Sequence, residues 1–411
     1  MTKCYVLLTV IFIVISSSVC SQESDSLRDK FRPKHPQDVK NLDNPLIKPA
    51  PAKTKRLSFN VLGYVKLLGT VDWGNVQNTS EFITSEIPIY PKPREKSVRS
   101  SFDPRQTRIA LEGFYQVKEN KKLRIYIETD FYNSEPIVDF RLHLRYAYIE
   151  YGKFLIGQNW STAFNIDAVP NQVDFEGPNS LAVSTNGQIR YTHLQDKFSF
   201  AIAIETHLED FTPYDAVDEV FDFQSIPDLI AYAQTQGNWG NVRLTGIFRN
   251  IDFTNPTNSG VDHLFGWGVN FTGYTTFLKR KRIFDAFYWG FIYGKGIAFY
   301  IDDISGMGLD AVPDKNGVMQ CLPAHGSFVA YKHAWGPRME SNIIASYVKL
   351  DNTNINNDLI FDETLYGAVN LMYNPFDRIN LGIEFLRGKN VNKKQDFGEG
   401  YRIQIMSQFN F

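Results

Sequence analysis

From residue 57 to the last residue, polar and apolar side chains alternate in one short stretch after another. In the clearest stretch, which runs from Arg124 to Phe131, the even-numbered positions are polar or aromatic, and Ile125, Ile127 and Phe131 lie on the opposite face. Side chains of a β-strand point to opposite faces with period two, so this pattern indicates strands with one polar and one apolar face. A sandwich with one solvated face would show the same pattern, so alternation alone does not decide the fold.

The lengths of the connections distinguish the two folds. We predict sixteen strands, at residues 58–73, 104–115, 122–132, 140–150, 153–160, 187–194, 197–207, 228–236, 241–253, 263–277, 283–301, 327–335, 338–350, 364–374, 378–389 and 401–411. Seven connections are short, at 118–121, 151–152, 195–196, 237–240, 278–282, 336–337 and 374–377. Eight are longer, at 74–103, 133–139, 161–186, 208–227, 254–262, 302–326, 351–363 and 390–400. Bacterial outer-membrane barrels have an even number of strands, short periplasmic turns and long external loops. The sequence therefore predicts an all-β fold, a sixteen-stranded antiparallel transmembrane β-barrel.

The N-terminal region has a different character from the barrel. A positive start at Lys3, an apolar run from Tyr5 to Ile15 and the small residues that follow indicate a signal peptide at 1–20. Cys20 is either removed with this peptide or is a lipid acceptor. Residues 21–56 are rich in proline and have few large apolar side chains, so we predict a flexible periplasmic arm. Residues 57–411 then form the barrel, in contact with outer-membrane lipid.

Composition excludes several other classes of protein. The formal net charge of −2 gives no reason to expect a nucleic-acid partner. Cys4 and Cys20 lie in the signal segment, so Cys321 has no cysteine to pair with within the mature chain. No stretch after the signal is apolar for long enough to form a spanning helix. The aromatic last strand, which ends at Phe411, resembles the signal read by the barrel-assembly machinery, and we expect that machinery to be a partner.

Arginines recur on the polar faces of the predicted strands. They are Arg105, Arg108, Arg124, Arg141, Arg145, Arg190, Arg243 and Arg249. A guanidinium stays charged at any relevant pH and can donate two parallel hydrogen bonds to a carboxylate or phosphate. On adjacent strands these residues would form a basic wall in the lumen, which lowers the barrier for anions. The alternative is that they pair with Glu112, Glu128 and Asp130 and only keep the lumen wet.

The third long loop, at 161–186, is long enough to fold into the barrel. It contains the acidic residues Asp167, Asp174 and Glu176. Opposite a basic wall, these side chains would create a narrow constriction with a transverse field and would temper any anion preference. The alternative is an external loop with solvated acidic residues.

Other kinds of site have little support in the sequence. The histidines show no paired metal-ligand spacing, and we find no convincing combination of serine, histidine and acid for hydrolysis. We therefore expect no catalytic residue, no metal site and no cofactor.

Four motifs, in this order, resemble the DcaP-like trimeric porins, which are related to the general and phosphate-selective porins. The motifs are Ser101–Ile109, Ile127–Phe131, Arg145–Gly152 and Leu155–Thr162, and the close resemblance covers residues 100–165. The resemblance implies a homotrimer of sixteen-stranded barrels that takes up small, often negatively charged organic molecules. It also implies that Arg105, Arg108, Arg124, Arg141 and Arg145 are candidates for the constriction. Residues 21–56 differ from the helical extension of some relatives, because they are proline-rich and lack heptads.

These observations together predict an outer-membrane porin for the passive diffusion of small hydrophilic solutes, with a preference for anionic organic molecules. Three alternatives remain open at this point. One is an adhesin or structural barrel with a blocked lumen, another is a barrel enzyme, and the third is a soluble secreted β protein.

Overall fold

The computed structural model describes residues 57–74, 76–90, 98–118, 121–132, 141–207, 210–212, 224–255, 260–280 and 283–411. The predicted signal peptide (1–20) and periplasmic arm (21–56) lie outside the described residues and stay predictions. Among the described residues, no helix is long and apolar enough to span a membrane. Most of them lie in β-strands.

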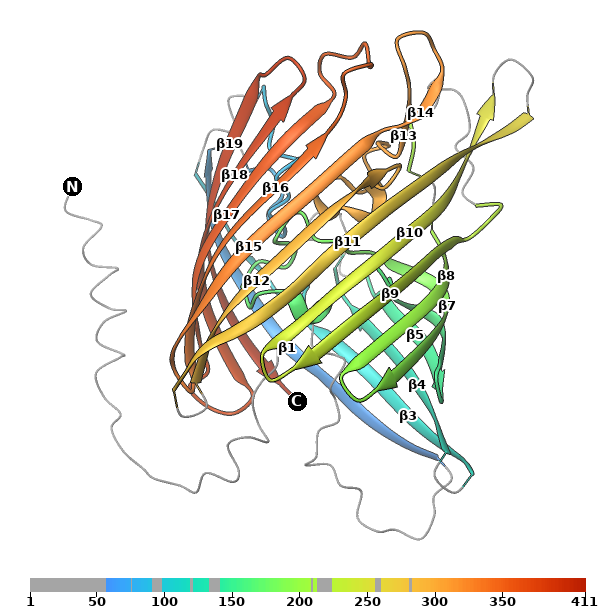
Figure 1. The fold of residues 1–411 in the computed structure, drawn as a ribbon. Coiled ribbons are helices and arrows are strands. Elements are labelled where there is room, and N and C mark those ends of the chain that lie inside the picture. Colours follow the sequence, from blue (N-terminus) through green and yellow to red (C-terminus); the bar gives the residue numbers. More distant parts are fainter. Residues whose placement is uncertain are drawn as a thin grey trace, which may run out of the picture. The chain divides into compact units, whose positions relative to one another are not determined.

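The strands form one closed antiparallel barrel (Figure 1). They are β1 (Leu57–Gly74), β2 (Arg99–Asp103), β3 (Arg108–Lys118), β4 (Lys121–Asp130), β5 (His143–Tyr151), β6 (Phe154–Trp160), β7 (Thr185–Gln195), β8 (Phe198–Thr206), β9 (Asp228–Gly237), β10 (Gly240–Asn255), β11 (Gly260–Arg280), β12 (Ile283–Lys295), β15 (Pro323–Gly336), β16 (Met339–Leu350), β17 (Phe361–Tyr373), β18 (Ile379–Asn392) and β19 (Phe397–Asn410). β1 pairs with β19 on one side and with both β2 and β3 on the other. β2 and β3 follow each other along the same side of β1, so together they occupy one strand position of the barrel. The barrel therefore has sixteen strand positions.

All sixteen predicted strands are present, but three of them need correction. The predicted strand 140–150 begins only at His143. The predicted strand 104–115 is interrupted, because Pro104 has no N–H for the ladder and Thr107 N–H donates to Pro104 O (2.9 Å) in a turn. The predicted strand 283–301 ends at Lys295, and Gly296 follows with a φ of 65°. The chain then forms the short turns η5 (Ala298–Tyr300) and η6 (Asp302–Ile304).

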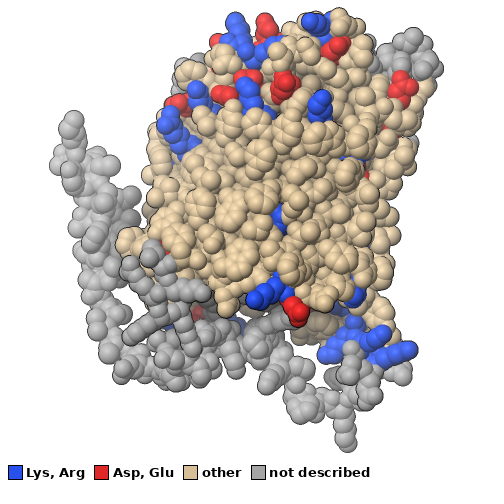
Figure 2. Space-filling view, viewed as in Figure 1, with Lys and Arg blue, Asp and Glu red and all other residues tan. Residues whose placement is uncertain are grey.

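The outward face of the barrel is apolar. In β19, Ile403 and Ile405 are exposed, whereas Arg402 and Gln404 are buried on the inward face, as the alternation predicts. Figure 2 shows a broad belt with few charged side chains, and Lys, Arg, Asp and Glu gather toward its two ends. An apolar band of this kind is the surface that a transmembrane barrel presents to lipid.

Three of the long connections fold into the lumen. They are loop 1 (described at 76–90), loop 3 (161–184, with η4 at Ile166–Ala168) and loop 6 (296–322, with the hairpin β13 Ala311–Pro313 and β14 Met319–Cys321). Ile297 and Ile301 of loop 6 pack with Ala163 and Ala182 of loop 3 in one apolar cluster. The same cluster includes the inward-facing wall residues Ile230, Ile247, Ile292 and Val348. The inward position predicted for loop 3 is confirmed, and loops 1 and 6 share it.

Candidate functional site

Arg108 on β3, Arg124 on β4 and Arg145 on β5 face the lumen on adjacent strands; we call these three residues the arginine wall. Arg124 Nε lies 2.7 Å from Glu112 Oε1, and its Nη1 lies 2.8 Å from Glu150 Oε2. The wall therefore contains ion pairs along its length. The alternative stated above, in which the arginines pair with neighbouring carboxylates, applies to much of the wall.

Glu128 of β4 joins the other two arginines of the wall. Its Oε1 lies 3.2 Å from Arg145 Nε and 3.4 Å from Arg108 Nη1. Arg145 Nη1 also lies 2.9 Å from Asp130 Oδ2. Arg108 is only 2% exposed, and its guanidinium makes no hydrogen bond among the described residues, so the ion pair with Glu128 is the main compensation for its charge.

Arg145 reaches this position because of a β-bulge. Glu128 pairs with Tyr146 and Thr129 pairs with Leu144, so Arg145 is the extra residue between two register positions. Tyr146 and Tyr148 are buried on the lumen side, and strict alternation would have turned Arg145 outward. A bulge re-aims one side chain without ending the strand, and here it adds a guanidinium to the wall.

The residue of loop 3 that faces the arginine wall is Phe175. The Cζ atoms of Arg108 and Arg145 each lie 5.3 Å from the centre of its ring. Tyr132 packs against the same ring, with 5.7 Å between the ring centres. Cations stack favourably on aromatic faces. Phe175 therefore covers the two buried arginines with an apolar ring that also attracts their positive charges.

The three acidic residues predicted for loop 3 have other partners. Asp174 accepts hydrogen bonds from its own-loop neighbours and from Tyr366 Oη of β17 (2.8 Å), and burial raises the pKa of its carboxyl. Asp167 accepts from Asn241 Nδ2 of β10 (3.2 Å). Burial, and then the charge of Asp302 of loop 6, raise the pKa of the Glu176 carboxyl well above its ordinary value. Among the described residues, no ion pair joins these three acids to an arginine.

Arg190 and Arg243 lie farther round the lumen. Arg190 of β7 shares the inward face with Asn186 and Gln188 and is half-buried. Arg243 of β10 is 2% exposed, and its Nη1 donates to Phe164 O of loop 3 (2.8 Å). Arg190 is therefore accessible from the lumen, whereas Arg243 holds loop 3 against the wall.

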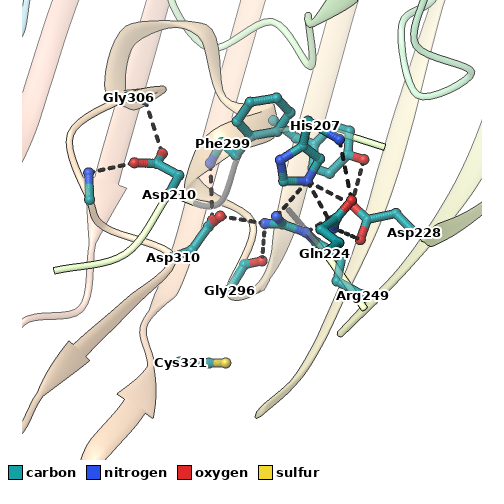
Figure 3. Close-up of polar contacts among 12 residues, drawn as sticks. His207, Asp210, Gln224, Asp228, Arg249, Gly296, Phe299, Gly306, Asp310 and Cys321 are labelled. Carbon is teal, nitrogen blue, oxygen red and sulfur yellow. Dashed lines mark hydrogen bonds and ion pairs between the residues drawn. The ribbon is translucent and has the colours of Figure 1, made fainter. Parts of the chain in front are cut away.

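Arg249 of β10 belongs to a buried network beneath loop 6 (Figure 3). Its Nη1 lies 2.6 Å from Asp310 Oδ2 of loop 6, and its Nε lies 3.0 Å from Asp228 Oδ2 of β9. Its Nη2 also contacts His207 Nε2 at 2.7 Å. The side chain is fully buried, so it anchors loop 6 to the wall and has no surface to offer a solute.

The remaining two predicted arginines lie outside the strands. Arg105 is in the turn between β2 and β3, where its Nη2 lies 3.0 Å from Asp103 Oδ2 and its Cζ lies 5.5 Å from the ring centre of Tyr132. Arg141 precedes β5 and is exposed. The prediction that both lie on strand walls is therefore wrong, because Pro104 interrupts one strand and the other begins at His143.

Sequence reasoning missed three buried cations of the lumen, and Lys332 of β15 (7% exposed) is one of them. Lys66 of β1 is 3% exposed, and Arg402 of β19 pairs with Asp72 Oδ1 at 2.6 Å. All three lie on the inward face of alternating strands, so the alternation that predicted the other arginines also applies to them. Among the described residues, no group of His, Cys, Asp and Glu could hold a metal ion.

A model of the DcaP outer membrane protein family matches residues 117–411, well over half of the sequence. The chain belongs to this family. The fold of this DcaP-family protein is similar to that of the outer membrane channel DcaP of Acinetobacter baumannii, with a TM-score of 0.73 and 19% identity over 87% of this chain and 99% of that chain. It is also similar to the trimer form of OmpT from Vibrio cholerae, with a TM-score of 0.51 and 9% identity over 86% of this chain and 99% of that chain. OmpF of Salmonella typhi, solved in complex with daunomycin, has a TM-score of 0.50 and 11% identity over 85% of this chain and 97% of that chain.

No curated protein sequence matches the chain. Family and fold together make this DcaP-family protein an outer-membrane protein of the porin type, located in the bacterial outer membrane.

Proposed function

We propose that this DcaP-family protein is a passive channel for small hydrophilic solutes and that it prefers anionic organic molecules. The observation that supports the preference most directly is the environment of Arg190. Its guanidinium is half-buried on the inward face of β7, and among the described residues no carboxylate lies within ion-pair distance of it. An uncompensated positive charge in a confined lumen attracts anions and repels cations.

The arginine wall gives weaker support for the preference. Arg108, Arg124 and Arg145 are matched by Glu112, Glu128, Asp130 and Glu150, so the wall has no net positive charge. Arg124 is the most accessible of the three, with 21% of its side chain exposed. We propose that a solute anion contacts Arg190 and Arg124, and that the buried arginines set the field behind them.

Substitution of Arg190 tests the anion preference. In planar bilayers with a KCl gradient, we expect Arg190→Gln to lower the ratio of anion to cation permeability about twofold, because a lumen charge is lost while size and polarity are kept. Arg387→Gln is the matched control, since Arg387 lies on the outward face of β18 with 57% of its side chain exposed. Equal reversal potentials for the wild type and Arg190→Gln would contradict the role of Arg190.

One observation favours a second candidate function, a structural or adhesive barrel with a blocked lumen. Loops 3 and 6 form a continuous apolar cluster with the inward face of β9, β10, β12, β15 and β16, which fills part of the cross-section. Well-folded protein that inserts into bilayers and gives no conductance would support this second candidate.

A further inference from the structure

Lys66 of β1 is a buried cation without a partner for its charge. Its side chain lies on the inward face of the strand, and the residue is only 3% exposed. Among the described residues, its ammonium group makes no ion pair and no hydrogen bond. A buried charge is costly unless an opposite charge and hydrogen bonds compensate it. The ammonium group therefore points to a compensating group that does not belong to the chain.

The carboxylates of this part of the lumen are engaged by other donors. Three of them act on Lys66 through their charge, namely Asp103, Asp174 and Glu384. Asp103 Oδ2 lies 3.0 Å from Arg105 Nη2 in an ion pair. Asp174 Oδ2 accepts from Tyr366 Oη (2.8 Å), and Glu384 Oε2 accepts from Asn370 Nδ2 (2.8 Å). Since none of the three lies within ion-pair distance of Lys66, they leave its ammonium group without a counter-ion in contact.

Arg108 lies in the same part of the wall as Lys66. It stands opposite Tyr64 of β1, and Tyr64 and Lys66 are two positions apart on one inward face. Two residues of a strand span about 7 Å, so the two cations share a small region. Nε, Nη1 and Nη2 of Arg108 are buried and have no hydrogen-bond partner among the described residues. The region therefore contains more hydrogen-bond donors than its acceptors satisfy.

Two buried glutamines add donors to this region. Gln106 is in the turn between β2 and β3, and Oγ1 of its neighbour Thr107 accepts from the backbone N–H of Lys66 (3.1 Å). Gln172 is in loop 3, and the residue after it shares an apolar cluster with Leu68, the next inward-facing side chain of β1. The amide nitrogen and oxygen of both glutamines are buried without a hydrogen-bond partner among the described residues. We call Lys66, Gln106, Arg108 and Gln172 the donor cluster.

We propose that the donor cluster binds one small monovalent anion of the halide class, enclosed between β1, the β2–β3 turn and loop 3. Ammonium, guanidinium and amide groups all offer N–H donors to such an anion. Its single negative charge offsets the charge of Lys66, whereas the arginine wall is already balanced by its own carboxylates. A water molecule would accept the hydrogen bonds but would leave this charge uncompensated.

Burial decides the size of the ligand. All four residues of the donor cluster are at most 3% exposed, so the site is closed to an organic solute and suits a single ion. Such an ion would hold loop 3 to β1. The inference goes beyond the proposed function, because an enclosed anion can be bound whether or not solutes pass through the lumen.

Crystals of the full-length protein grown with sodium bromide test the site, because bromide replaces chloride and is located by its anomalous scattering. In the wild type we expect a bromide in contact with Lys66 Nζ and with at least one N–H group of Arg108. Lys66→Met removes the charge and keeps the unbranched apolar part of the side chain, so we expect the bromide peak to be lost. Water alone at this position in the wild type overturns the proposal, and so does an unchanged bromide in Lys66→Met.

Lys332→Met is the matched control, because Lys332 is another buried lysine on the inward face but has a carboxylate of its own. It is 7% exposed, and its Nζ lies 3.7 Å from Glu340 Oε2. We expect Lys332→Met to keep the bromide at the donor cluster, and loss of the bromide in this variant as well would overturn the dependence on Lys66. If Lys66→Met fails to fold, the wild-type crystals still decide whether the anion is bound.

Thermal unfolding in detergent provides a second test without crystals. An anion that binds only the folded protein stabilises it. At constant ionic strength, we expect replacement of gluconate by chloride to raise the melting temperature of the wild type and of Lys332→Met by about 3 °C or more. We expect Lys66→Met to melt at the same temperature in both salts. An equal shift in all three proteins would be a general effect of the salt and would overturn the site.

Discussion

Glu128 is the residue on which the arginine wall depends most, because it compensates two guanidinium groups at once. Arg108 and Arg145 are both nearly buried, and their distances to Glu128 Oε1 are 3.4 and 3.2 Å. Loss of one partner from a buried ion pair leaves an uncompensated charge, which costs about 3 kcal/mol or more. We therefore expect Glu128→Gln to lower the free energy of unfolding by about 3 kcal/mol.

Denaturant unfolding in detergent or lipid vesicles measures this loss. Glu399→Gln is the matched control, because Glu399 pairs with Arg387 on the outward face, where the two side chains are 29% and 57% exposed. An exposed pair contributes at most about 1 kcal/mol, so the control should be close to the wild type. Equal losses in the two variants would show that the wall does not depend on Glu128.

The residues of the site could be predicted only where side chains alternate strictly between the inward and outward faces of a strand. The inward faces of Arg108, Arg124 and Arg190 follow from alternation alone. The sequence predicts Arg145 on the polar, inward face of its strand. In the structure Tyr146 and Tyr148 also lie on that face, and Arg145 joins them through a bulge that no local pattern indicates. Phe175 was missed because a phenylalanine in a loop has no sequence feature that marks the arginines it covers.

At the scale of elements, glycines on the inward faces of the strands make room for loop 3. A side chain at Gly326 of β15 would place its Cβ 2.8 Å from Ser180 Cβ, which is closer than carbon atoms pack. Ser180 N–H also donates to Ser346 Oγ of β16 (3.2 Å), so this part of the loop lies directly on the wall. We expect Gly326→Val to displace loop 3 and to raise the single-channel conductance about twofold.

A glycine on the lipid side separates this effect from the effect of valine in a strand. Gly367 of β17 has only one atom, Ile344 O at 4.0 Å, near the position of an added Cβ. We expect Gly367→Val to conduct as the wild type does. If Gly326→Val conducted no better than Gly367→Val, loop 3 would not be the element that narrows the lumen.

The strands were predictable because each one has lipid on one side and the lumen on the other along its whole length. Its side chains therefore alternate between apolar and polar, and this alternation is visible in the sequence. The interruption at 104–107 and the early end of β12 at Lys295 depend on single Pro and Gly residues. The infolding of loops 1 and 6 could not be predicted, because their contacts join residues far apart in sequence. Thr84 and Asp303, for example, are 219 positions apart.

At the scale of the whole molecule, the assembly state remains a proposal. The resemblance to DcaP-like porins implies a homotrimer, and one structure with a similar fold is described as a trimer form. We expect the purified protein in mild detergent to have about three times the mass of one chain by light scattering, after correction for bound detergent. A particle with the mass of a single chain would contradict the trimer.

The distribution of charge in the lumen is the feature of the whole molecule that bears most on transport. Most arginines on the inward face are paired with carboxylates, so the anion preference depends on the few that are not. Arg190, which is accessible from the lumen, is the clearest of these. Such a channel should be mildly rather than strictly selective, because compensated charges lower the barrier for both signs of ion.

The reversal potential of the wild-type protein in a planar bilayer tests the central claim most directly. With a tenfold KCl gradient across the membrane, the proposed function predicts stable channel conductance. It also predicts a reversal potential with the sign expected for a channel that is more permeable to chloride than to potassium. A reversal potential of the opposite sign would contradict the anion preference, and an absence of conductance would contradict the channel.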